Sequence, residues 1–123
     1  MNLQYIFDAV VKHAGKQQAI AINSEDINDF CMYRAPDGKK CFVGALIKDE
    51  FYSPDLENNP VKELPVIHAV EKSLGYRLSS DELSMLKDLQ AVHDNASVPK
   101  WQSIFEELAV KYHIQFKGDL YNG

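Results

Sequence analysis

The chain has 123 residues, of which 46% are hydrophobic and 25% charged, and its formal net charge at pH 7 is −5. These values are typical of a globular domain and exclude disordered, collagen-like and low-complexity classes. No apolar run approaches the roughly 20 residues of a membrane-spanning helix, and the mild acidity argues against nucleic-acid binding, which usually needs a basic face. We therefore expect one globular domain over residues 1–123 that binds neither nucleic acid nor membrane.

The N-terminal segment lacks the basic region of a signal peptide, and the chain contains only two cysteines, Cys31 and Cys41. Disulfides are rare in reducing compartments, so this composition favours a cytoplasmic protein with free thiols. The sequence leaves the oligomeric state open.

The first predicted element is a helix over residues 2–14, which Gly15 can end in a left-handed conformation. Its apolar side chains recur at helical spacing: Leu3, Ile6, Phe7, Val10, Val11 and Ala14. A short apolar stretch over residues 19–22 fits a strand or the edge of a loop.

A β-hairpin is predicted next, over residues 31–43. Pro36 presets the first corner of a type I turn, Asp37 tolerates the second, and Gly38 accepts the left-handed position of a bulge. This three-residue loop places Arg34 directly opposite Lys40. Residues 43–52 then predict one short helix.

Three further helices follow. Pro65 opens a helix that Gly75 closes, and residues 79–82 match a capping box that starts the next one. Residues 95–99 break that helix, and a last apolar stripe runs over residues 101–112. The predicted fold is therefore α+β, a mostly helical domain of four or five helices with one β-hairpin near residues 31–43.

The hairpin is also the predicted partner site. Tyr33, Arg34, Lys39 and Lys40 place one aromatic ring and three cations around a rigid tip. Arg and Tyr are enriched at interface hot spots, and a preorganised turn lowers the ordering cost of binding. Two like charges directly opposite destabilise a strand pair, so an anionic group on a partner would explain Arg34 and Lys40. A solvated, solubilising face is the alternative, and Tyr33 fits the core equally well.

Two chemical alternatives remain open. Cys41 precedes a predicted helix, where a thiolate is stabilised, and His93 with Asp94 could supply a base and the group that orients it. A thiol-dependent enzyme would use these three residues. A small metal site could instead use Cys31, Cys41 and His93, although its spacing is not that of a zinc knuckle. No cofactor-binding motif occurs, so we expect no cofactor.

The pattern of residues 31–57 and 89–94 resembles a group of small uncharacterised bacteriophage and prophage proteins. The shared pattern reads C-x-Y-R-x-P-D-G-x-x-C-x-x-G-x-L-I, then D-E-x-Y-x-P and an E-G pair, and finally L-Q-x-x-H-D. This chain departs from it at Glu57-Asn58. The resemblance implies a setting in the bacterial host cytoplasm. A non-catalytic phage protein of this size acts most often by binding a host protein, and we expect inhibition or modulation of such a partner, for example in a defence system.

Overall fold

The computed structural model describes residues 2–18, 32–57, 59, 61 and 63–116. Within these ranges the chain forms four α-helices, namely α1 (Leu3–Gln17), α2 (Leu64–Leu74), α3 (Ser80–Asn95) and α4 (Trp101–Lys111). Single turns of 3-10 helix connect them: η1 (Gly44–Leu46), η2 (Asp49–Phe51), η3 (Pro54–Leu56) and η4 (Val98–Lys100). The described part of the chain contains no helix that is both long and apolar enough to cross a bilayer.

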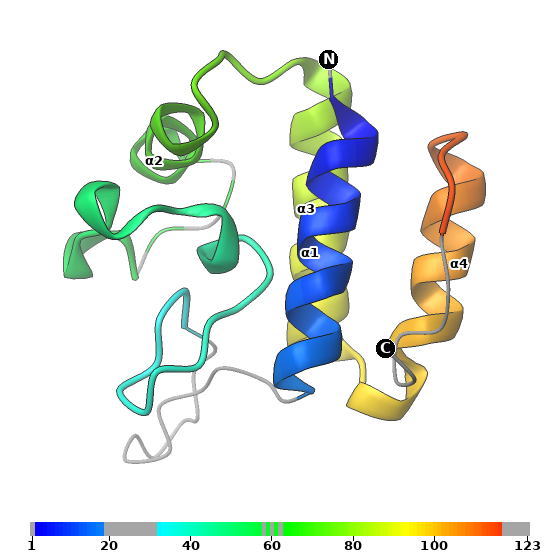
Figure 1. The fold of residues 1–123 in the computed structure, drawn as a ribbon. Coiled ribbons are helices and arrows are strands. Elements are labelled where there is room, and N and C mark those ends of the chain that lie inside the picture. Colours follow the sequence, from blue (N-terminus) through cyan, green and yellow to red (C-terminus); the bar gives the residue numbers. More distant parts are fainter. Residues whose placement is uncertain (1, 19–31, 58, 60, 62, 117–123) are drawn as a thin grey trace.

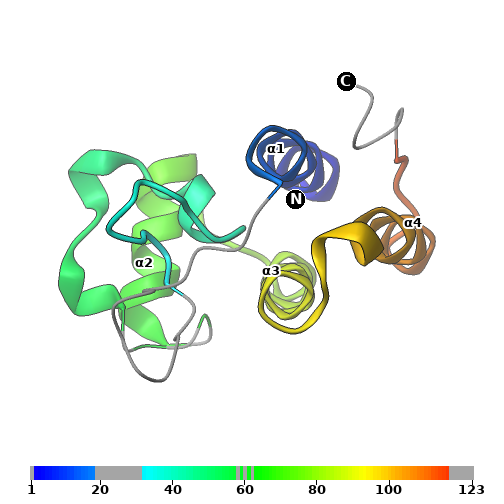
Figure 2. The ribbon, with the colours of Figure 1, turned by 90° about the horizontal axis from the view of Figure 1, so that it is seen from below.

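Helices α1, α3 and α4 lie beside one another, with α1 packed on α3 and α3 packed on α4 (Figure 1). Figure 2 shows these three helices end on as a triangle, with α2 and the segment from residue 32 to η3 forming a second layer. Turn η1 connects the layers because it contacts both α1 and α2.

Aromatic side chains fill the space among the three helices and η1. The ring of Phe42 packs against Trp101 and Phe105 at centroid distances of 4.9 and 5.6 Å, and Phe7 meets Phe105 edge-on at 5.9 Å. Phe42 comes from the segment before η1, so this non-helical segment contributes to the centre of the core. Aromatic pairs in these geometries add about 0.5–1.5 kcal/mol each beyond the area they bury.

The helix boundaries follow the capping chemistry of the sequence. Helix α2 ends at Gly75, whose φ of 87° is left-handed, and α3 starts with the predicted capping box between Ser79 and Glu82. Helix α1 is longer than predicted, because it passes through Gly15 and ends at Gln18 with a φ of 47°. Beyond the glycine the side chain of Gln17 bonds to the backbone of Lys40, and a glycine costs only about 1 kcal/mol inside a helix.

The α+β prediction, with a β-hairpin at residues 31–43, is wrong. The described residues contain one isolated antiparallel bridge, Arg34 with Lys40, and no strand. The turn has the predicted register, since the N–H of Ala35 bonds to the carbonyl of Lys39 at 2.8 Å and that of Cys41 bonds to Tyr33 at 3.3 Å. Beyond that bridge no ladder forms. The predicted single helix over residues 43–52 is also replaced by the two turns η1 and η2.

Side chains from other elements bind the backbone on both sides of this bridge, including the N–H groups of Tyr33 and Val43, which a longer strand ladder would have used. Glu57 accepts from the N–H groups of Tyr33 and Arg34, Gln17 bonds to Lys40, and Gln90 accepts from Val43. Buried backbone donors need a partner, and these are supplied by three other elements. The turn is therefore fixed by tertiary contacts. The stretch predicted over residues 19–22 lies outside the described residues.

Candidate functional site

The four residues predicted to bind a partner lie together at one turn, residues 32–40, but differ in accessibility. Tyr33 is 6% exposed, and its hydroxyl donates to the carbonyl of Asn59 at 2.5 Å. Tyr33 therefore supports the turn from inside. Pro36, Asp37 and Gly38 are exposed at the tip, while Lys39 and Lys40 are partly exposed on its returning side.

The tip is closed by its own aspartate. Oδ1 of Asp37 accepts from the N–H of Lys39 at 3.0 Å, and Oδ2 pairs with Nζ of the same lysine at 2.7 Å. The hydrogen bonds from Lys39 hold the pKa of Asp37 below its ordinary value. An Asp side chain that bonds to the backbone two residues ahead rigidifies a turn without help from elsewhere.

Arg34 joins the turn to η2. Its Nη2 donates to the carbonyl of Ile47 at 2.9 Å and pairs with Oδ1 of Asp49 at 2.7 Å. The guanidinium carbon lies 4.5 Å from the centroid of the Tyr52 ring. Nε of Arg34 is buried without a hydrogen-bond partner among the described residues. An unsatisfied buried donor costs about 1–3 kcal/mol, so the contacts of Nη2 and Tyr52 must compensate for it.

The carboxylate of Glu57 holds the start of the turn. Oε1 accepts from the N–H of Tyr33 at 2.9 Å, and Oε2 accepts from the N–H of Arg34 at 3.1 Å and from the Tyr52 hydroxyl at 2.5 Å. Burial and the hydrogen bond to Glu57 raise the pKa of Tyr52 above its ordinary value. Two consecutive backbone donors on one carboxylate fix both the direction and the register of the chain.

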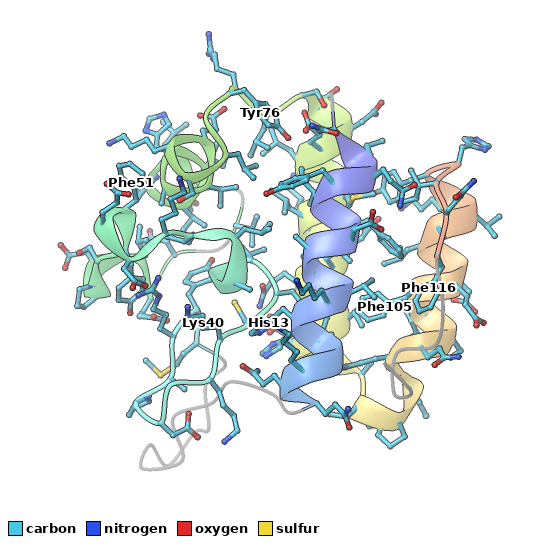
Figure 3. The ribbon with its side chains drawn as sticks, viewed as in Figure 1. His13, Lys40, Phe51, Tyr76, Phe105 and Phe116 are labelled. Carbon is cyan, nitrogen blue, oxygen red and sulfur yellow. The ribbon has the colours of Figure 1, made fainter. Side chains whose placement is uncertain are left out.

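Helix α1 holds the other end of the turn. Gln17 accepts from the N–H of Lys40 and donates to its carbonyl, both at 2.8 Å. His13 donates from Nε2 to the same carbonyl at 2.9 Å. Figure 3 labels His13 and Lys40. Burial lowers the pKa of His13, and the nearby charges of Lys40 and His93 lower it further, outweighing the hydrogen bond that would raise it.

The three residues of the alternative thiol site share one polar network. Nδ1 of His93 and Nε2 of Gln90 both bond to Oδ1 of Asp94, at 2.8 and 2.9 Å. Oε1 of Gln90 accepts from the N–H of Val43, and the Cys41 sulfur accepts from the N–H of Gly44 at 3.2 Å.

The surroundings of Cys41 oppose nucleophilic chemistry. Cys41 is 0% exposed, and burial raises the pKa of its thiol well above the ordinary value. His93 is equally buried and lies against the rings of Phe42 and Trp101. A reactive cysteine needs a stabilised thiolate and access to substrate. This network is therefore suited to holding the segment before η1 on α3.

The metal alternative has no support from the described residues. They contain no group of three or more His, Cys, Asp or Glu side chains that could hold a metal ion. Cys31, the third ligand of the predicted set with Cys41 and His93, lies outside them.

Sequence reasoning missed the residues that brace the turn: His13, Gln17, Asp49, Tyr52, Glu57 and Gln90. Four of them lie in the two sequence segments that the sequence analysis singled out, residues 31–57 and 89–94, and these segments meet in the structure. Gln17 gave no signal, since a polar residue near the end of a helix is normally solvated.

Comparisons of this chain with protein-family models, with curated proteins and with solved structures found no match.

Proposed function

We propose that this chain is a small, non-catalytic binding protein that attaches to a host protein in the bacterial cytoplasm and inhibits or modulates it. The contact surface is the turn at residues 32–40, in which Lys39 and Lys40 offer the accessible cations and Tyr33 and Arg34 hold the shape.

The observation that carries the proposal is the bracing of an exposed tip from two directions. Glu57 fixes the backbone that enters the turn, and Gln17 and His13 fix the backbone that leaves it. Three side chains from two other parts of the chain are an extensive support for a turn whose tip is exposed. Rigid presentation lowers the entropy lost on binding, and this is what such bracing supplies.

The resemblance to small phage proteins supports the host setting. Burial of the Cys41 thiol removes the main argument for catalysis at the neighbouring polar network. The burial of Cys41 concerns a site outside the turn, so the role of the turn can be tested separately.

Affinity capture from bacterial lysate tests the proposal. We expect the wild-type chain to retain a host protein, identified by mass spectrometry, and the double variant Lys39→Glu with Lys40→Glu to lose it. The matched control is Lys12→Glu with Lys16→Glu, which makes the same charge change on the exposed face of α1. Equal capture by both double variants would contradict a role for the turn, provided that circular dichroism shows both to be folded.

A further inference from the structure

Arg34 and Lys40, two cationic residues, lie directly opposite each other across the turn. The backbone hydrogen bonds join the flanking residues, Ala35 with Lys39 and Cys41 with Tyr33, so the Arg34–Lys40 bridge is of the non-hydrogen-bonded kind. Side chains come closest in such pairs, with Cα atoms about 4.5 Å apart. Like charges placed directly opposite repel each other, so this face attracts an anion.

The chain itself provides one carboxylate for the two cations. Asp49 pairs with Arg34 at 2.7 Å, and its side chain is 86% exposed. Among the residues described, no carboxylate lies within ion-pair distance of Lys40. An exposed ion pair of this kind contributes little stability, so the carboxylate of Asp49 can be exchanged for another at small cost.

The guanidinium is already oriented to receive that second carboxylate. The ring of Tyr52 lies under it, and the Ile47 carbonyl fixes Nη2, so the side chain loses little freedom on binding. A planar guanidinium fits a carboxylate with two parallel hydrogen bonds, which a lysine cannot offer.

We propose that Asp49 is an internal stand-in for a carboxylate of the partner: a glutamate or aspartate of a protein segment displaces it and binds to Arg34 and Lys40. This inference rests on the proposed function and names the partner's chemistry. A nucleic acid fits less well, because its many phosphates would lie against the exposed carboxylates of Glu50 and Asp55, in a chain of net charge −5.

A titration with two matched peptides tests this inference. The probes are acetyl-Gly-Glu-Gly-amide and acetyl-Gly-Gln-Gly-amide, added at low salt to the 15N-labelled chain, with a single-stranded DNA oligonucleotide in a third arm. We expect the glutamate peptide alone to shift the amide resonances of residues 34, 40 and 49. Binding by the glutamine peptide to the same extent, or tighter binding by the oligonucleotide at these residues, would overturn the proposal.

Variants separate displacement from simple attraction. Asp49→Asn removes the internal competitor and should strengthen binding of the glutamate peptide about two- to five-fold, the range set by exposed ion pairs. Lys40→Gln should weaken it, and Glu50→Gln is the control that removes a neighbouring charge without touching Arg34. If Asp49→Asn and Glu50→Gln increase the affinity for the glutamate peptide equally, the effect is one of general charge, and displacement of Asp49 is refuted.

The same variants distinguish the two proposals in lysate. A captured host protein whose retention is unchanged by Asp49→Asn and Lys40→Gln would leave the binding function standing and refute the carboxylate site. If the wild-type chain captures no host protein, the binding function itself fails.

Discussion

Gly44 lets the chain turn into η1 directly against the carbonyl of Tyr33. A Cβ atom added at Gly44 would lie 2.1 Å from that oxygen, far inside contact distance. Gly38 is needed for a different reason: its φ is 92°, while the space around it is open. One glycine is required by packing and the other by backbone conformation.

Gly44→Ala should therefore destabilise the fold by about 2–3 kcal/mol, because the backbone of two segments must separate. Gly38→Ala is the comparison and should cost about 1–2 kcal/mol from the left-handed conformation alone. Urea denaturation of both variants gives the two free energies of unfolding. A smaller loss in Gly44→Ala than in Gly38→Ala would contradict the close approach at Tyr33.

Cys41 should react slowly with iodoacetamide at neutral pH, at least about tenfold slower than free cysteine, because its thiol is buried and its pKa is raised. Peptide mass mapping of the alkylated Cys31→Ser variant follows Cys41 alone. If Cys41 is modified quickly in the folded chain and no faster in urea, the thiol-enzyme alternative is restored.

At the scale of elements, the segment from η2 to η3 acts as a strap over the turn. It supplies Asp49 and Tyr52, and the residue that follows it supplies the carboxylate of Glu57; all three contact Arg34. The strap contains no residue in regular α or β structure, yet it determines how residues 32–40 are oriented.

Glu57→Gln should lower the free energy of unfolding by about 1–3 kcal/mol, because one of the two carboxylate oxygens that accept from the turn becomes a donor. Glu50→Gln, on the exposed side of η2, should leave stability within about 0.5 kcal/mol of wild type. Hydrogen exchange at the amides of residues 33 and 34 should also accelerate in Glu57→Gln. Unchanged exchange there would show that Glu57 is dispensable for the turn.

The helices were predictable from sequence and the β-hairpin was not, for a physical reason. Local signals such as Gly75 and the capping box at Ser79 act within a few residues, and the structure contains them. Pro36 to Gly38 is an equally local turn signal, and it gives the turn with the predicted register. Whether strands extend from a turn depends on distant competitors for the backbone, here Glu57 at the N–H of Tyr33 and Gln90 at the N–H of Val43. No pattern within residues 31–43 contains that information.

At the scale of the whole molecule, His13 links the stability of the fold to pH. Burial lowers its pKa from the ordinary 6.5, so the folded chain favours the neutral ring. The free energy of unfolding is therefore unaffected by protonation of His13 above about pH 6.5. It decreases as the pH falls below that value, because the unfolded chain then binds more protons than the folded chain.

The decrease in the free energy of unfolding between pH 7.5 and 5.5 should thus be smaller in His13→Gln than in the wild-type chain. The amide of glutamine can still donate to the Lys40 carbonyl without titrating. Urea denaturation at a series of pH values measures the slope of the free energy of unfolding against pH for both proteins. The remaining histidines are common to the two proteins. Identical slopes would show that His13 does not couple protonation to folding.

Helix α1 is anchored to parts of the chain that are made much later. The N–H of Asn2 donates to Glu82, and the side chain of Gln4 bonds to the backbone of Gln115 in both directions. At ribosomal speeds the interval between the first and the last of these residues is on the order of ten seconds. Until α3 and α4 have been synthesised, the apolar face of Ile6, Phe7 and Val10 has neither helix to cover it. Such an exposed apolar face makes a growing chain prone to aggregation, and the turn cannot be fully braced before α3 is made.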